Sequence, residues 1–172
     1  HVTGSSDVCS SDLTSRICGI CPIAYIMGAS QAVEDALGII VTPEIHALRR
    51  MIYCGEWIQS NTLHAAMLHA PDFLGLASAM DIAKTNPDLV KKALRVKKMG
   101  NTLMVLIGGR AVHPVNTKVG GFFRAPDPEA IAGLIPELEW CANAARELTL
   151  DFARFDFPED EHDYHFVSLI HD

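Results

Sequence analysis

Apolar residues recur at about the helical period along most of this chain, and the first such run begins at Pro22. Proline is tolerated in a first turn because its missing N–H has no partner there in any case. Gly38 follows the run and is a typical stop signal. The pattern therefore predicts a helix from Pro22 to about Gly38, with an apolar face made of Ile23, Ile26, Met27, Ala29, Val33, Ala36 and Leu37.

A second start signal stands at Thr42-Pro43-Glu44, where a hydroxyl cap precedes a proline and an acidic residue. The helical pattern then continues to about Ala70 and is interrupted only by Gly55. A helix of this length would extend roughly 40 Å. We therefore expect it to be the central helix of the fold.

Three further helices are predicted downstream, at Pro71 to Ala83, Asn86 to Ile107 and Asp127 to Phe155. The second of them carries a basic face that we expect to be solvated: Lys91, Lys92, Arg95, Lys97 and Lys98.

The segment from Gly108 to Pro126 is rich in glycine and proline, which indicates an irregular loop with a functional role. Strands are expected at most as short pieces after Pro158. The predicted fold class is therefore mainly α, a bundle of long helices with one glycine-rich loop and minor β.

Composition agrees with a single globular domain, since 49% of the 172 residues are hydrophobic and 20% are charged. The net charge of -7 argues against a nucleic-acid surface, which needs a stripe of lysine and arginine. No apolar run reaches the roughly 18 residues of a membrane span. Five cysteines without an even-spaced framework do not resemble a secreted disulfide scaffold. These features predict a cytoplasmic protein with reduced thiols.

The two ends of the chain have the character of a fragment. Residues 1–13 are rich in serine and aspartate, lack an apolar period and resemble translated sequencing adapter, so they are excluded from the fold together with Cys9. Residues 14–172 are expected to form part of a larger domain.

Cys18 and Cys21 form a C-x-x-C pair at the predicted helix start at Pro22. Such a pair can bind a soft metal, cycle as a disulfide or simply pack. The N–H groups of the helix start and nearby Arg16 are expected to lower the thiol pKa values and favour metal-binding thiolates. A redox pair normally follows a strand, and a zinc site needs two more ligands at close spacing. From these residues alone the alternatives stay open.

Seven short motifs, taken in order, resemble the large subunit of nickel–iron hydrogenases from about Ser15 to the end of the chain. The string Cys-Gly-Ile-Cys-Pro-Ile-Ala-Tyr is similar to the cytosolic, pyridine-nucleotide-linked branch of that family. The resemblance implies part of the hydrogenase large-subunit fold. The motifs are Arg16–Pro22, Glu44–Arg50, Gly55–Trp57, Leu63-His64, Gly108–Arg110, His113-Pro114 and Gly120–Phe122.

The resemblance also implies a function, the reversible oxidation of H2 to protons and electrons at a nickel–iron centre. It assigns Cys18 as a terminal nickel ligand and Cys21 as the bridge between nickel and iron. The iron would carry carbon monoxide and cyanide, delivered by maturation proteins. Two more cysteines belong to a C-terminal D-P-C-x-x-C motif that this sequence lacks. We therefore expect the fragment alone to be inactive.

Three more residues are implied near this centre. Arg16 and His113 would lie towards the nearest iron–sulfur cluster of a small partner subunit. Tyr25 stands where the family usually has a histidine beside a bridging sulfur, and a phenol can donate a hydrogen bond there but cannot titrate near neutral pH. In the same way, Asn61 follows Ser60 where the family usually has histidine. Neither change removes a metal ligand.

The partners implied by the resemblance are a diaphorase-type module and the iron–sulfur small subunit, with NAD(P) left open as a cofactor of a further subunit. Two alternative functions remain: a metal-free subunit of the complex I type, structural or quinone-reactive, and a thiol-redox or zinc module. His46, His64 and His69, at spacings of 18 and 5, lack the i, i+4 spacing of a helical metal face. They are interpreted as groups that pack in the core between helices or that support a nearby site.

Overall fold

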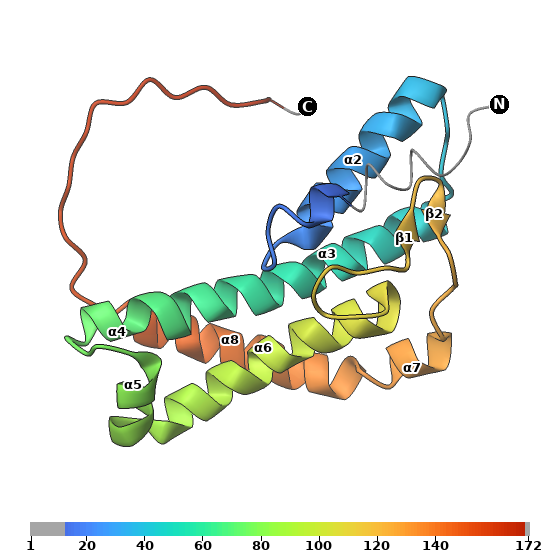
Figure 1. Cartoon of the computed structure of the whole chain (residues 1–172). Coiled ribbons are helices and arrows are strands. Elements are labelled where there is room, and N and C mark those ends of the chain that lie inside the picture. The colour runs from blue at the N-terminus through green and yellow to red at the C-terminus, as the bar shows by residue number, and fades with distance from the viewer. Residues whose placement is uncertain (1–12, 171–172) are drawn as a thin grey trace.

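The computed structural model describes residues 13–170 and is mainly helical, as the sequence predicts (Figure 1). Residues 1–12 of the segment interpreted as adapter lie outside the described part, and the side chain of Leu13 is exposed. In chain order the elements are α2 (Pro22–Leu37), α3 (Pro43–Leu63), η1 (His64–His69), α4 (Ala70–Phe73), α5 (Ala79–Thr85), α6 (Pro87–Gly108), β1 (Thr117–Lys118), β2 (Gly121–Phe122), α7 (Pro128–Ala132) and α8 (Ile135–Phe152).

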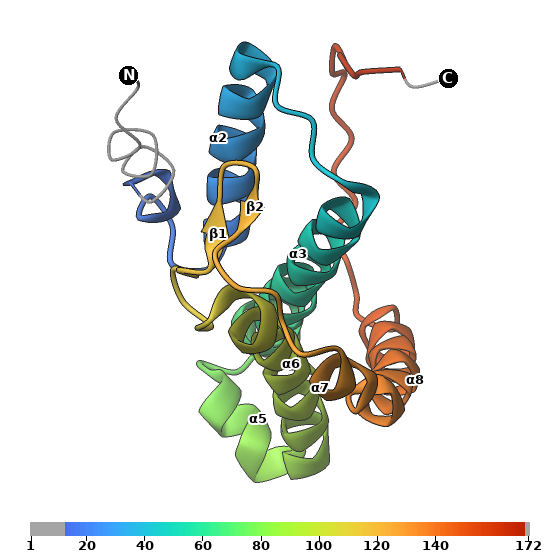
Figure 2. The ribbon, with the colours of Figure 1, turned by 90° about the vertical axis from the view of Figure 1, so that its right-hand side faces the viewer.

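The long helix α3 lies at the centre of the bundle. Helix α6 packs along it, α8 packs on α6, and α2 lies beside the N-terminal half of α3 next to the β1–β2 hairpin (Figures 1 and 2). One apolar core joins α3, η1, α6 and α8, and a second joins α2, α3 and α6. The second core contains Ile23, Ile26, Met27, Ile52, Met104 and Ile107.

The predicted helix starts are confirmed by capping hydrogen bonds. Thr42 Oγ1 accepts from the N–H of Ile45 at 3.5 Å, and the side chain of Asn86 accepts from the N–H of Leu89 at 3.2 Å. At the other end of α2, Gly38 has φ 65°, a left-handed conformation in which glycine is unstrained. The expected central helix also continues past Gly55, through α3 and η1, as far as His69.

Two predicted helices are each divided in the structure. The helix expected over 71–83 ends at Phe73, because Gly75 adopts φ 65° and takes the chain out of the helical path. The helix expected over 127–155 is split into α7 and α8. Pro136 lies in the first turn of α8, where it has no N–H to donate to a carbonyl of α7.

Two other expectations are wrong in part. The short strands occur inside the glycine-rich loop, where Thr117 pairs with Phe122, and residues 156–170 contain none. The basic face of α6 is only partly solvated, since Lys92 bonds Glu147 at 2.6 Å and Arg95 bonds Glu137 at 2.7 Å. These ion pairs join α6 to α8.

The end of α3 continues as a π-helical segment, which a periodicity of 3.6 does not reveal. The wider turn places the Nε2 atoms of His64 and His69 only 2.7 Å apart, on an exposed face. The interpretation that these two histidines pack in the core is therefore wrong, because both are exposed and contact each other.

Helices α3 and α6 approach most closely at Gly55 and Gly100. A Cβ atom added to Gly100 would lie 2.6 Å from the backbone N of Gln59, and one added to Gly55 would lie 2.9 Å from the Cβ of Leu103. Both glycines are buried. The absence of a side chain at these two positions is what allows the two backbones to come together.

A buried ion pair connects α2, α3 and the hairpin. Both Arg49 Nη atoms donate to the Glu34 carboxylate, at 2.7 and 2.5 Å, and each side chain is only 5% exposed. The same carboxylate accepts from the N–H of Gly120 at 2.7 Å, while Arg49 also donates to the carbonyl of Lys118. The hydrogen bonds from Arg49 lower the pKa of Glu34 below its ordinary value, and they outweigh the effect of burial.

We predict that Gly100→Ala destabilises the chain by about 1–3 kcal/mol, because the new methyl group overpacks the contact with α3. The matched control is Gly28→Ala in α2. A Cβ atom there meets nothing within 4 Å, and the change should add about 0.5–1 kcal/mol of helix stability. Urea unfolding followed by circular dichroism gives both values. Equal effects of the two changes would contradict the proposed close contact.

We predict that Arg49→Met costs about 3–5 kcal/mol at pH 7, because it leaves the Glu34 carboxylate buried without its cation. The control is Lys92→Met, which breaks an ion pair with the 62%-exposed Glu147 and should cost less than about 1 kcal/mol. The folded-state pKa of Glu34 lies below its ordinary 4.5. The wild-type pair therefore stabilises fully above about pH 4.5 and less as the pH falls through the folded-state pKa.

Glu34→Gln should remove the decrease in the free energy of unfolding that the Glu34 carboxylate causes as the pH falls. Unfolding curves at several pH values between 3 and 7 measure it. A Glu34→Gln variant with the wild-type slope in this range would show that another carboxylate is responsible.

Candidate metal centre

Cys18 and Cys21 lie where the chain turns into α2, and both thiols are free and half-buried. Cys21 is the residue that caps α2, and its backbone N–H donates to the sulfur of Cys18 at 3.4 Å. The expected position at the start of a helix is therefore confirmed, and the two thiols are not bonded to each other in this structure.

The two thiols differ in acidity. A hydrogen bond from the Cys21 thiol, with further bonds from the backbone N–H groups of Cys21 and Ile20, lowers the pKa of Cys18. Because Cys21 donates to Cys18 and is also partly buried, its own pKa is raised to about 11. The sequence-based expectation of two acidic thiols is thus wrong for Cys21. In this arrangement the Cys21 thiol donates the hydrogen bond and the Cys18 sulfur accepts it.

Two side chains of α3 bind the backbone on either side of Cys21. The Glu56 carboxylate accepts from the N–H of Ile23 at 2.5 Å and from that of Ala24 at 3.2 Å. The Gln59 amide donates to the carbonyl of Ile20 at 2.7 Å. Glu56 is 2% exposed, and this burial raises its pKa against the effect of the two N–H bonds.

The sequence did not predict this role of Glu56, because the contact joins two helices that the pattern of apolar residues does not relate. The available signal is that no basic residue stands three or four positions from Glu56, although the surrounding stretch is largely apolar. A buried acid without a cation needs N–H or O–H donors. Here those donors belong to the first turn of α2.

The glycine-rich loop reaches the turn that precedes Cys18. Nδ1 of His113 lies 2.8 Å from the carbonyl oxygen of Ser15, so the ring is assigned as the Nδ1–H donor. His113 has φ 49°, and its own carbonyl accepts a bond from Arg110 Nε at 2.5 Å. The structure thus brings together His113 and the segment that contains Arg16, whose side chain is exposed.

Tyr25 lies in the first turn of α2 and is 38% exposed. Its carbonyl accepts a hydrogen bond from Thr14 Oγ1 at 3.4 Å, which ties the same preceding turn to α2. The residues expected around the cysteine pair therefore gather at one end of α2.

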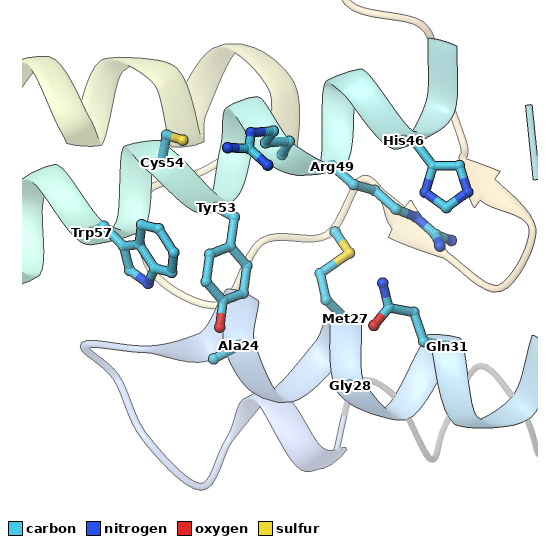
Figure 3. A pocket seen from close by; sticks show the side chains of 10 residues that line it. Ala24, Met27, Gly28, Gln31, His46, Arg49, Tyr53, Cys54 and Trp57 are labelled. Atoms are coloured by element: carbon cyan, nitrogen blue, oxygen red, sulfur yellow. The ribbon is translucent and has the colours of Figure 1, made fainter. Parts of the chain in front are cut away.

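A pocket of about 490 Å³ lies between α2 and α3 and is lined along α2 from Ala24 to Gln31 (Figure 3). Tyr53 and Trp57 extend from α3 towards α2, their rings edge-to-face at 4.9 Å between centroids, while Met27 and Gln31 extend from α2. The pocket starts at Ala24, one turn into the helix that Cys21 caps. Neither Cys18 nor Cys21 lines this pocket.

The donor chemistry of the pair fits a soft or borderline metal such as nickel, because sulfur is a soft donor and both thiols are free. No group of three or more histidine, cysteine, aspartate or glutamate side chains within residues 13–170 could hold a metal ion. Cys18 and Cys21 could therefore offer two donors to such a metal, and no third donor of these types completes a group with them in this part of the chain.

Comparisons with known proteins identify the relatives of this chain. The family of nickel-dependent hydrogenases matches residues 4–92. The alpha chain of sulfhydrogenase 2 from Pyrococcus furiosus is 41% identical over 83% of this chain and 33% of its own length. The alpha chain of sulfhydrogenase 1 from the same organism is 34% identical over 72% of this chain and 29% of its own length.

Solved structures show the same fold. An NAD+-reducing [NiFe]-hydrogenase in the H2-reduced state superposes with a TM-score of 0.74 at 24% identity, over 83% of this chain and 34% of that one. The reduced, active Ni-Fe-Se hydrogenase of Desulfomicrobium baculatum gives 0.71 at 23% identity, over 87% and 35%.

This chain thus spans about a third of the length of its relatives. Across residues 13–170, no helix has the length and apolar character that a membrane crossing requires. The residues that match the family contain the cysteine pair together with α2 and α3. The chain belongs to the nickel-dependent hydrogenase family.

Proposed function

We propose that the complete protein to which this chain belongs catalyses the reversible oxidation of H2, and that Cys18 and Cys21 are ligands of its nickel–iron centre. The observation that carries the proposal is the pair of free thiols at the capped start of α2, in a chain of the nickel-dependent hydrogenase family. Cys18 would be a terminal nickel ligand and Cys21 the bridge to iron. When bound, such a centre supplies a Lewis acid that splits H2 heterolytically.

Several residues of this chain would hold or support that centre. Cys18 and Cys21 supply soft sulfur donors, and hydrogen bonds lower the pKa of the Cys18 thiol. The start of α2 fixes Cys21, and His113 holds the turn before Cys18 through Ser15. Tyr25, on the first turn of α2, is proposed to lie beside the bridging sulfur.

We also propose the partners and cofactors that this function needs. The iron would carry carbon monoxide and cyanide placed by maturation proteins, and electrons would leave through an iron–sulfur small subunit. The string Cys-Gly-Ile-Cys-Pro-Ile-Ala-Tyr is similar to the pyridine-nucleotide-linked branch, which supports a diaphorase-type module with NAD(P) and a cytoplasmic location. Arg16 and His113 would lie towards the nearest iron–sulfur cluster.

Two alternatives are less well supported. A metal-free subunit of the complex I type has no need of two free thiols at a helix start, whereas both are present here. A zinc module would need two more close ligands, and residues 13–170 offer no third donor. For a redox pair, no strand precedes the C-x-x-C segment within the described part of the chain.

We predict that Cys18→Ser and Cys21→Ser each abolish nickel incorporation in the complete large subunit matured with its partners, because a serine hydroxyl is a poor substitute for a soft thiolate. Cys54→Ser is the matched control, since it removes another half-buried free thiol from the neighbouring helix α3 and should leave nickel unchanged. Elemental analysis of the purified proteins gives the nickel content. Full nickel occupancy in either Cys18→Ser or Cys21→Ser would refute the ligand assignment.

We predict that His113→Ala keeps its nickel but slows H2 oxidation with an external acceptor by roughly 10- to 100-fold. Loss of the bond to Ser15 would displace the turn on the proposed electron route. Hydrogen–deuterium exchange should fall less, since it needs only the metal centre. His113→Asn is the control, because asparagine tolerates positive φ and retains an N–H donor. Equal losses of exchange and oxidation in His113→Ala would rule out the electron-route role.

A further inference from the structure

We propose that Glu56 and Gln59 are positioning residues that hold Cys21 in the orientation needed for metal binding, an inference that rests on the function proposed above. Their side chains project from successive turns of α3 and are 2% and 6% exposed. Glu56 holds the backbone that follows Cys21, through Ile23 and Ala24, and Gln59 holds the carbonyl of Ile20 that precedes it. Cys21 is thus fixed on both sides by one helix.

The start of α2 explains why an acid is needed at this point. The first N–H groups of a helix have no partner within the helix, and a capping side chain at the preceding residue usually accepts from them. Here that residue is Cys21, whose side chain makes no capping hydrogen bond in the described structure. Pro22 has no N–H to satisfy. The two N–H groups that remain, on Ile23 and Ala24, both donate to Glu56.

This arrangement moves the capping function from Cys21 to another helix. A serine, threonine or aspartate at the capping position would turn its oxygen back towards the helix N–H groups. Because Glu56 already satisfies them, the sulfur of Cys21 is not needed there and stays available as a ligand. Glu56 therefore accepts from the helix N–H groups, which leaves the side chain of Cys21 for metal binding.

The helix that carries these two residues is itself fixed. Gly55 precedes Glu56 and lies against α6, while the backbone N of Gln59 faces Gly100. Glu56 and Gln59 lie about one turn apart on a helix that packs tightly against α6. Their side chains therefore have little freedom to move relative to the cysteine loop, residues 18–21. Sites built on rigid elements hold ligand geometry better than sites built on loops.

The test uses the matured holoenzyme and compares Glu56→Gln with Gln59→Met. The first replaces one acceptor oxygen with an amide nitrogen that cannot accept, and the second keeps the side-chain length but removes the donor to Ile20. Nickel content, the electron paramagnetic resonance spectrum of nickel and the melting temperature are recorded for each. We expect nickel to be retained, the g-values to shift and H2 oxidation to fall by about 10- to 100-fold.

Glu34→Gln is the matched control. Glu34 is also a buried carboxylate between α2 and α3 that accepts a backbone N–H bond, but it lies at the other end of α2. It should lower the melting temperature and leave the nickel spectrum of the folded protein unchanged. If Glu56→Gln fails to fold, Gln59→Met decides the question.

Two outcomes would overturn the proposal if the unmodified holoenzyme contains nickel. One is an unchanged nickel spectrum in both the Glu56→Gln and the Gln59→Met variant. The other is a spectral shift of the same size in Glu34→Gln. Failure of the proposed function has a different signature, which is a wild-type holoenzyme without nickel. That result would overturn both proposals at once.

Discussion

The close approach of α3 and α6 at Gly55 and Gly100 is the constraint on which the other features of this structure depend. It fixes the central helix against the apolar core. From that helix Glu56 and Gln59 reach the cysteine loop, and about two turns earlier Arg49 reaches the opposite end of α2. Helix α2 is thus bound to α3 at both ends by polar contacts, with apolar packing between them. A methyl group at the crossing would push α3 away from α6 and disturb the packing between these two helices.

Two buried carboxylates that contact α2, those of Glu34 and Glu56, show how the neighbouring groups set the pKa of an acid. Glu34 faces the guanidinium of Arg49, which lowers its pKa, whereas Glu56 faces only N–H dipoles, and burial raises its pKa. The first is a charged structural link between three elements. The second lies next to a thiol pair and adds negative potential there, which is one reason why the pKa of Cys21 is raised. The same residue type thus serves stability in one place and ligand geometry in the other.

The sequence was sufficient for features that depend on local signals. Thr42, Asn86 and Gly38 mark helix ends through capping and left-handed conformation, and the structure confirms each of them. It was not sufficient where distant contacts decide. The pairing of Thr117 with Phe122, the bonds from α6 to α8 and the contacts of Glu56 all join residues that no periodicity relates. Likewise the π-helical turn at His64 departs from the 3.6-residue period of an α-helix, so the spacing of apolar residues does not reveal it.

The contacts that hold the turn before Cys18 and the far end of α2 join residues far apart in the chain. His113 binds Ser15 across 98 residues, and Gly120 binds Glu34 across 86. Contacts of such separation form late, because the intervening chain must first be brought into place. During synthesis on the ribosome, both cysteines are therefore exposed long before residues 113–120 exist to hold the turn and helix around them. Through that interval the two thiols are open to whatever delivers metal, and equally to oxidants.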